Sequence, residues 1–341
     1  MTTYTPPPRS DGTIQVARVK QPWPKDMLFK ILLIDGGGIK GVFPAAYLAD
    51  IERRYLNGES VAGYFDMVAG TSTGGIIALG LSKGLTSRQI LKFYQDDGRK
   101  IFPSKNGFLW WRFISHFVFR KFDQNNLKNS LQHVFGQSLI NDAKIRLIIP
   151  SFEGKHGEPF IFKTPHHPDY KIDKHKLMID VALQTSAAPT YFQAIDDNGY
   201  IMLDGGLWAN NPVMNALVDV LSCYDVPREN IRILSIGNGN KNFKMSKFAM
   251  IGGLLSWAER AFQAANIAQS KNALGQAYLL VGKHNVTRVD LAEIENDIEM
   301  DDVSRALSEL PSVAKAYAES SGPIIRDVFL SIRADDFTPS N

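Results

Sequence analysis

Two short apolar runs, each followed by a glycine-rich turn and then by a helical pattern, constrain the fold of this chain more than any other feature. Residues 27 to 34 have the sequence MLFKILLI and lead into DGGGIKG, and residues 65 to 70 have the sequence FDMVAG and lead into TSTGG. Short aliphatic runs of this kind are typical of strands that are covered on both faces. Strands joined by helices pair in parallel through right-handed crossovers, so the pattern predicts an α/β fold.

Further strands are predicted along the rest of the chain, with helical patterns between or after them. We expect them to complete a three-layer α/β/α arrangement around a mostly parallel central sheet. A helical insertion is predicted near residues 86 to 135, and a helical extension at the C-terminal end. The additional strand candidates are residues 145 to 152, 159 to 164, 200 to 206 and 231 to 239.

The composition along the chain indicates one domain with a less regular beginning. Residues 1 to 26 are rich in Pro, Thr and Ser and are predicted to form a flexible arm. Residues 27 to 240 form the predicted core. Residues 241 to 341 are predicted to be a helical part of the same domain and a candidate regulatory region, although no residue spacing there identifies a sensor.

Charge and cysteine content narrow the classes of partner and compartment. The 38 Lys and Arg residues nearly balance the 35 Asp and Glu residues, so the net charge does not point to a nucleic acid polymer as partner. Cys223 is the single cysteine and lies in an apolar helical pattern, which is typical of a packed core thiol. The N-terminal sequence lacks the apolar segment of a secretory signal, and no apolar stretch is long enough to cross a bilayer. We therefore expect a cytoplasmic protein.

The first glycine-rich turn permits two interpretations. Gly36, Gly38 and Gly41 match the G-x-G-x-x-G pattern of dinucleotide-binding folds, and they lie between a predicted strand and a predicted helix. That pattern also requires an acidic residue at the end of the second strand, where this chain has Ala69 and Gly70. The interpretation as a phosphate cradle is therefore weakened, and the alternative is a loop that holds an oxygen anion during bond breaking.

The second turn, from Gly70 to Gly74, is a G-x-S-x-G sequence between a predicted strand and a predicted helix. In a nucleophile elbow, small residues on both sides of the serine allow a strained bend that exposes its hydroxyl. The sequence therefore predicts that Ser72 is a nucleophile. The alternative is a tight glycine turn whose serine only caps a helix.

The two turns are expected to meet, because both follow the carboxyl ends of strands in one sheet, where open α/β proteins place their ligands. With Ser72 as nucleophile, the N–H groups of Gly36, Gly37 and Gly38 can converge on the oxyanion of a tetrahedral intermediate. One such donor typically contributes about 3 to 4 kcal/mol of transition-state stabilisation. The oxyanion interpretation is preferred because it explains both turns at once.

No histidine has the sequence context of a general base. His166 and His167 are predicted to lie in a solvated loop, and adjacent histidines lack the i, i+4 spacing that lets two rings hold one metal ion, so no metal is predicted. A serine needs a base to take its proton, and Asp204 follows a predicted strand and precedes a Gly-Gly pair. Asp204 is the preferred base, with a local Asp-Gly turn as the alternative. Asp35 is a competing carboxylate that is interpreted as shaping the glycine turn.

Three motifs in this order resemble the patatin-like phospholipase family: D-G-G-G-x-[KR]-G at residues 35 to 41, G-x-S-x-G at 70 to 74 and D-G-G at 204 to 206. The resemblance implies a patatin-like three-layer fold and a Ser72–Asp204 dyad without a catalytic histidine. It also implies an oxyanion hole from Gly36 to Gly38, and hydrolysis of lipid acyl esters without calcium or another cofactor.

Four further motif positions have supporting roles under this resemblance. They are Lys40, Gly41, Gly70 and Gly74. Lys40 occupies the family's basic position, where contact with a phosphate headgroup or with a loop is expected.

The sequences ILLIDGGGIKG and GTSTGGIIALGL also resemble the phospholipase effectors of bacterial antiphage (CBASS) systems, which cyclic oligonucleotides activate. This resemblance implies a quiescent enzyme that degrades the phospholipid membrane of its own cell after a cyclic dinucleotide binds. It also implies peripheral attachment to the inner membrane during activity, and formation of a homo-oligomer on activation.

Residues 99 to 123 concentrate aromatic and basic side chains at helical spacing. Such a helix suits docking on an anionic membrane surface, or a lid over the active site. An apolar stripe at this spacing is also typical of an ordinary buried helix face, so both interpretations stay open. The residues on the predicted apolar face are Trp110, Phe113, Ile114 and Phe117.

Two alternatives fit the same motifs. A serine esterase or thioesterase that acts on soluble acyl groups would use the same nucleophile and oxyanion loop. A nucleotide-binding module without catalysis would instead use the glycine turn to hold phosphates.

Overall fold

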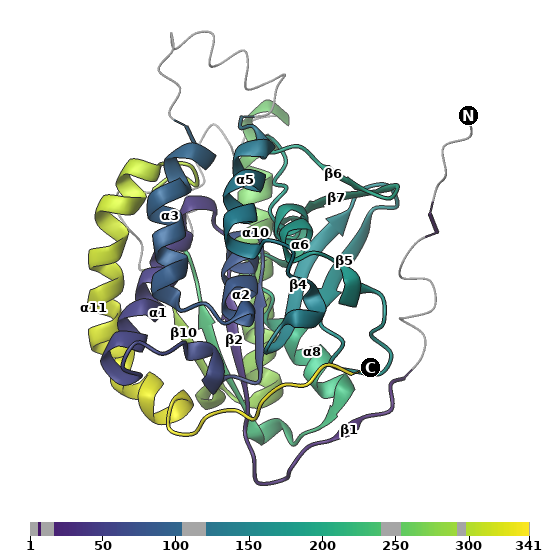
Figure 1. Cartoon of the computed structure of the whole chain (residues 1–341), viewed down its shortest axis with the longest axis vertical. Coiled ribbons are helices and arrows are strands. Elements are labelled where there is room, and N and C mark those ends of the chain that lie inside the picture. The colour runs from purple at the N-terminus through teal and green to yellow at the C-terminus, as the bar shows by residue number, and fades with distance from the viewer. Residues whose placement is uncertain (1–5, 8–16, 104–120, 240–253, 292–297, 341) are drawn as a thin grey trace.

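A mixed β-sheet forms the centre of the molecule (Figure 1). The computed structural model describes residues 6–7, 17–103, 121–239, 254–291 and 298–340. In these residues, eight strands form one sheet in the order β10-β9-β2-β3-β4-β7-β6, and β5 also pairs with β4. The strands are β2 (Phe29–Ile34), β3 (Met67–Gly70), β4 (Arg146–Glu153), β5 (Glu158–Lys163), β6 (Ile195–Asp197), β7 (Tyr200–Asp204), β9 (Ile231–Ile236) and β10 (Val286–Val289).

The direction of the strands changes at β4. The strands from β10 to β4 pair in parallel, whereas β4 pairs antiparallel with β5 and β7, and β7 antiparallel with β6. The prediction of a mostly parallel sheet is therefore confirmed for the half that carries both glycine-rich turns. Short hairpins join β4 to β5 and β6 to β7, and such connections produce antiparallel neighbours.

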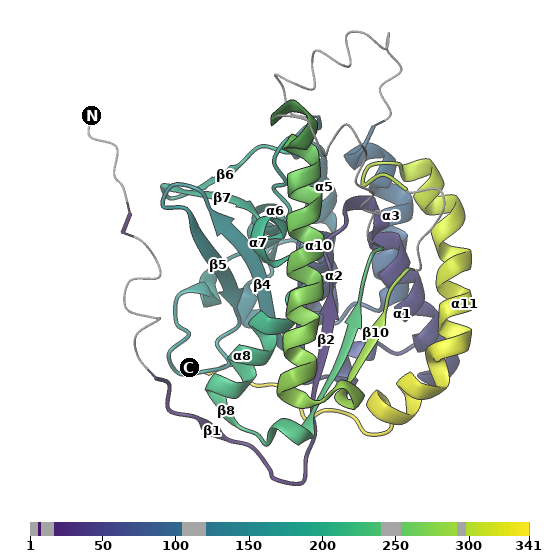
Figure 2. The same ribbon diagram turned by 180° about the vertical axis from the view of Figure 1, so that it is seen from behind.

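Helices cover both faces of the sheet, which confirms the predicted three-layer α/β/α fold. One face carries α1, α2, α3, α5, α6 and α11, and Figure 2 shows α8 and α10 on the opposite face. The bounds are α1 (Val42–Tyr55), α2 (Thr73–Lys83), α3 (Ser87–Ile101), α5 (Gln124–Phe135), α6 (Met178–Thr185), α7 (Gly206–Ala209), α8 (Val213–Cys223), α10 (Leu254–Val281) and α11 (Val303–Phe329).

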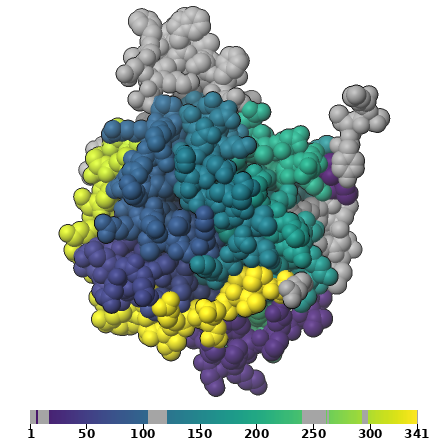
Figure 3. All heavy atoms as spheres, viewed as in Figure 1, coloured from purple at the N-terminus to yellow at the C-terminus, as the bar shows by residue number. Residues whose placement is uncertain are grey.

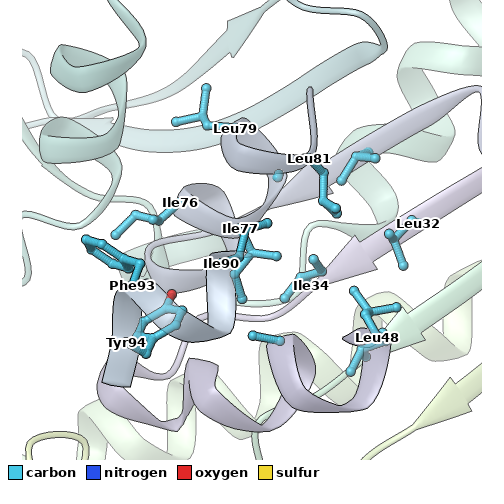
Figure 4. Close-up of a cluster of buried hydrophobic side chains, with 14 of the residues drawn as sticks. Leu32, Ile34, Leu48, Ile76, Ile77, Leu79, Leu81, Ile90, Phe93 and Tyr94 are labelled. Atoms are coloured by element: carbon cyan, nitrogen blue, oxygen red, sulfur yellow. The ribbon is translucent and has the colours of Figure 1, made fainter. Parts of the chain in front are cut away.

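The core consists of two apolar layers that the sheet separates. Every residue of β2 is buried, and its side chains alternate between the layers: Leu32 and Ile34 pack under α1 and α2, whereas Ile31 and Leu33 pack toward α8. Figure 4 shows the first layer, in which side chains of α2 meet side chains of α3. Because both faces are covered, a continuous aliphatic run is the expected sequence of such a strand.

Two segments differ from the sequence predictions. Residues 17–26, predicted as part of a flexible arm, lie against the amino ends of the strands, where β1 (Gln21–Pro22) pairs with β8 (Tyr224–Asp225). The ring of Trp23 packs at a tilt against that of Phe29, with their centroids 4.6 Å apart, and gives this segment an apolar anchor. Figure 3 shows this segment in purple, beside the yellow C-terminal residues.

The C-terminal part was predicted to be helical, but it also contributes β10 to the sheet. This strand has only four residues, VTRV, and it gains its stability by pairing with β9 rather than from a long apolar run. Among the helices in the described part of the chain, none combines the length and the hydropathy that a membrane-spanning helix needs.

Candidate active site

The pairing of β4 brings two motif loops face to face. Residues 148–153 of β4 pair with β5 along one edge, whereas β3 pairs with residues 146–148 and β7 with residues 151–153. Because both of these stretches overlap the residues that pair with β5, β3 and β7 lie along the other edge of β4. They run toward each other along that edge, because β3 is parallel to β4 and β7 is antiparallel. β3 ends at Gly70, just before the serine turn, and β7 ends at Asp204. The topology therefore places the G-x-S-x-G and D-G-G motifs at the same point of the sheet.

The serine turn has the backbone geometry of a nucleophile elbow. Ser72 has φ +56° and ψ −121°, a conformation that costs a non-glycine residue about 1 to 3 kcal/mol. A Cβ atom on Gly70 would lie 2.1 Å from the carbonyl oxygen of Gly74, and one on Gly74 would lie 2.2 Å from that of Ile34. Both flanking positions therefore exclude side chains, which is the reason for the G-x-S-x-G sequence.

Ser72 and Asp204 are in direct contact. The Ser72 hydroxyl donates a hydrogen bond of 2.6 Å to Oδ2 of Asp204, and both side chains are almost fully buried. The other carboxylate oxygen accepts a 2.6 Å bond from the N–H of Gly206, which fixes the carboxylate plane. Burial raises the pKa of Asp204 to about 6, while the bonds from Ser72 and Gly206 oppose the shift. Among the described residues, no histidine bonds to either side chain.

The glycine turn lies against these two loops. The N–H of Gly36 donates to the carbonyl of Asn210 at 3.1 Å, so this donor is already occupied. For the N–H groups of Gly37 and Gly38, the described residues supply no acceptor. Gly38 has φ +59° and faces the carbonyl of Met300, a position that also excludes a side chain. Two of the three predicted oxyanion donors are therefore available, and Gly36 instead ties the turn to the loop after α7.

Lys40 and Gly41 are both in close contact with neighbouring loops and helices. Lys40 is buried and donates a 3.0 Å bond to the carbonyl of Gly239, which fits the loop contact that was one of its two expected roles. A Cβ atom on Gly41 would lie 2.2 Å from Oγ1 of Thr73, so glycine is required where the turn meets α2.

An apolar recess opens beside Ser72. It encloses about 500 Å³ of empty space, including its opening to solvent. Figure 4 shows three of its side chains, Ile76, Phe93 and Tyr94, where α2 meets α3. A recess of this composition suits a hydrocarbon chain better than a charged group. Its lining residues are Gly38, Ser72, Thr73, Ile76, Phe93, Tyr94, Ile101, Phe102, Leu127, Ser186, Ala188, Tyr191, Phe192 and Met300.

Three residues at the site were not identified from the sequence. Thr185, at the end of α6, accepts the N–H of Ser72 through Oγ1 at 3.0 Å and donates to the carbonyl of Pro150 at 2.6 Å. Arg288 forms an ion pair with Asp35 behind the glycine turn, and the carbonyl of Met300 accepts the N–H of Ile39. These contacts join segments that are distant in sequence, so no local motif indicates them.

The prediction of a solvated loop at His166 and His167 is wrong, because both side chains are buried. His166 bonds to Asp219 at 2.7 Å, and Lys163 and Tyr170 bond to the same carboxylate. Cys223 is buried beside this group, as predicted for a packed thiol.

Ligand atoms of His166, Asp219 and Cys223 lie within 4.8 Å of one another. Lys163 and Tyr170 already occupy Asp219, however, and burial raises the pKa of the Cys223 thiol to about 12. A protonated thiol is a poor metal ligand. We therefore interpret His166, Asp219 and Cys223 as a hydrogen-bonded cluster rather than a metal site.

The predicted aromatic and basic helix falls mostly on residues 104–120, which lie outside the described residues. The described residues on either side of it, Phe102 and Phe122, are packed together at 5.2 Å, and Phe102 lines the recess.

A serine on a strained strand-to-helix turn, bonded to a buried carboxylate beside an apolar recess, defines a serine hydrolase. Comparison with known proteins identifies the family. The family model described as patatin-like phospholipase matches residues 32–217, and the chain belongs to this family.

Relatives with named activities occur in bacteria. A Vibrio cholerae protein named cGAMP-activated phospholipase is 34% identical over 327 residues, which cover 85% of this chain and 90% of the relative. An Escherichia coli protein of the same name is 34% identical over 232 residues, 64% of each chain. Among solved structures, VipD from Legionella pneumophila aligns with a TM-score of 0.41 and 11% identity, covering 86% of this chain and 67% of VipD.

Proposed function

We propose that the chain is a phospholipase that cleaves acyl esters of membrane phospholipids, with Ser72 as nucleophile and Asp204 as general base. The observation that carries the proposal is the 2.6 Å bond from the Ser72 hydroxyl to the Asp204 carboxylate on the elbow. A base must lie within hydrogen-bond reach of the proton that it removes, and Asp204 meets this condition. With a pKa of about 6, Asp204 is mostly ionised at neutral pH and is a stronger base than an ordinary aspartate.

The reaction follows from this arrangement. Asp204 takes the Ser72 proton as the serine oxygen attacks the ester carbonyl carbon. The tetrahedral intermediate then collapses, the bond to the glycerol oxygen breaks, and that oxygen receives the proton from Asp204. Water, deprotonated by the same carboxylate, attacks the acyl-serine and releases a fatty acid, and Ser72 recovers its proton.

The oxyanion of each tetrahedral intermediate is assigned to Gly37 and Gly38, because the N–H of Gly36 is committed to Asn210. Backbone donors in a dry site stabilise developing negative charge without any rearrangement during the reaction. In this proposal the glycine turn stabilises the oxyanion that forms from the ester, and it does not bind the phosphates of a cofactor.

The apolar recess supports a lipid acyl chain as substrate. Its walls are mostly aliphatic and aromatic, and it begins at Ser72, so a hydrocarbon chain in it would present its ester to the nucleophile. An esterase for soluble acyl groups, the alternative, would bind short acyl groups that do not fill such a recess.

Activation by a cyclic dinucleotide is part of the proposal. It is supported by the relatives named cGAMP-activated phospholipase, which are 34% identical to this chain. We propose that the enzyme is cytoplasmic, rests inactive until the nucleotide binds, self-associates on activation and then acts at the inner membrane surface.

Fatty-acid release from phospholipid vesicles tests the proposal, with and without cyclic GMP-AMP and related cyclic dinucleotides. Wild type should release fatty acid only with one of these nucleotides, and Ser72→Ala and Asp204→Ala should release none. Ser222→Ala is the matched control, because among the described residues its hydroxyl bonds only to the Val218 carbonyl of its own helix. Release without nucleotide would contradict the regulation. Cleavage of short soluble esters but not of vesicles would favour the esterase, and no reaction of Ser72 with a fluorophosphonate would contradict the hydrolase.

A further inference from the structure

A buried ion pair holds the start of the glycine turn. The Arg288 guanidinium donates two hydrogen bonds to the Asp35 carboxylate, at 3.1 and 2.7 Å, and a third to Oγ of Ser235 at 2.7 Å. Asp35 is 3% exposed, so its charge is almost fully removed from water. A planar guanidinium that bonds both oxygens of a carboxylate fixes orientation as well as distance.

The contacts of Arg288 continue to the other end of the turn. Arg288 also donates to Asp290 at 2.6 Å, and Asp290 accepts the N–H of Gly239 at 2.9 Å. The carbonyl of Gly239 accepts the 3.0 Å bond from Lys40. Asp35 and Lys40, the charged residues on either side of the glycines, are thus joined through one connected set of contacts.

Neighbouring carboxylates stabilise the positive charge of Arg288. Burial disfavours a cation, but Asp35 and Asp290 outweigh it and raise the pKa of Arg288 above its ordinary value. Burial also raises the pKa of Asp35, and Arg288 opposes this shift. Removing Arg288 would therefore leave a buried carboxylate without its cation, directly before the glycines.

Glycine backbone has wide conformational freedom, so contacts of the flanking residues help to fix the direction of the N–H groups in the turn. We propose that Arg288 is a positioning residue that orients the N–H groups of Gly37 and Gly38 toward the oxyanion by holding Asp35. This inference rests on the proposed function for the role of those donors. It adds a residue from β10, outside the 32–217 segment that the family model matches, to the machinery of the site.

The rate constant for reaction of Ser72 with a fluorophosphonate tests the inference without lipid, in the presence of the activating cyclic dinucleotide, because the phosphoryl oxygen also needs the oxyanion donors. Arg288→Met should lower it by about 10- to 100-fold, since losing one donor outright costs about 100- to 1000-fold. Arg288→Lys should restore part of the rate. The double variant Asp35→Asn/Arg288→Met should be no slower than Arg288→Met, because both changes break the same contact.

Lys163→Met is the control for general destabilisation. It breaks another buried ion pair, from Lys163 on β5 to Asp219 at 2.8 Å, which lies several strands away from β10, and should lower the thermal unfolding temperature while leaving the fluorophosphonate rate unchanged. A rate for Arg288→Met equal to that of wild type, or lowered only as much as in Lys163→Met, would overturn the inference.

Hydrogen–deuterium exchange separates this inference from the proposed function. Arg288→Met should speed exchange at least several-fold in a peptide that spans Gly36 to Gly41, and Lys163→Met should not. Unchanged exchange in that peptide would overturn the positioning role even in an active enzyme. A wild type that neither reacts with the fluorophosphonate nor releases fatty acid would instead contradict the proposed function, while the exchange experiment would still decide the role of Arg288.

Discussion

The hydroxyl of Ser72 donates to Oδ2 of Asp204 across 2.6 Å, although 132 residues separate the two in sequence. The contact forms because β3 and β7 approach each other along one edge of β4. A base that bonds directly to the nucleophile needs no imidazole between them. The protonation of this single carboxylate should therefore control the reaction.

The rate should depend on pH through Asp204. Burial raises the pKa of its carboxyl to about 6, and only the ionised form can accept the Ser72 proton. With the activating cyclic dinucleotide present, we expect kcat/KM for a short neutral ester to rise about tenfold per pH unit below pH 6 and to level off above it. Asp204→Asn should retain little activity and no such rise. An unchanged profile in this variant would contradict the assignment of the base.

The elbow should not tolerate a methyl group. Gly74→Ala would place a Cβ atom 2.2 Å from the carbonyl oxygen of Ile34, so the backbone must shift. We expect the free energy of unfolding in urea to fall by about 2 to 4 kcal/mol. Gly275→Ala is the matched control, because Gly275 lies within α10 with open space at its Cβ position. That change should stabilise the protein by about 0.5 to 1 kcal/mol, and equal effects of the two would refute the steric argument.

Thr185 should support the elbow through its hydroxyl. Thr185→Val keeps the shape of the side chain but leaves the N–H of Ser72 and the carbonyl of Pro150 without their partner. We expect a loss of about 1 to 3 kcal/mol in the free energy of unfolding, together with a slower reaction of Ser72 with a fluorophosphonate. Thr185→Ser keeps the hydroxyl and should recover most of both. If serine and valine behaved alike, the hydroxyl would have no such role.

The recess should set the preferred acyl length. Ala188 lines it, so Ala188→Phe should fill part of the space that a long chain needs. We expect the ratio of kcat/KM for a decanoyl ester to that for an acetyl ester to fall about tenfold. The acetyl ester is the internal control for the chemical step. A proportional loss on both esters would show that the acyl chain lies elsewhere.

Local patterns predict much of this molecule. The run before Asp35 and the run before Ser72 form β2 and β3, because strands buried on both faces need continuous apolar sequence. The elbow follows from steric limits at Gly70 and Gly74. Asp204 was predicted from its place after a strand, and the structure places it beside Ser72.

Long-range contacts account for the parts that were not predicted. The Gly36 N–H is taken by Asn210, and no local feature of either segment indicates that bond. His166 lies in a polar sequence but is buried, because Asp219 of α8 supplies its partner. β10 is four residues long and is specified by its neighbour β9. In each case the partner that fixes the residue or strand lies far from it in the sequence.

The position of β9 between β2 and β10 also has a consequence during synthesis on the ribosome. Phe29 pairs with Ile231, so β2 has one free edge until more than two thirds of the chain has been translated. Arg288 emerges later still. A nascent chain that already contains Ser72 and Asp204 therefore lacks a central strand and the support of its glycine turn, and contacts of such long sequence separation form slowly. For an enzyme whose proposed substrate is the membrane of the cell that makes it, the order of translation itself delays the first moment of activity.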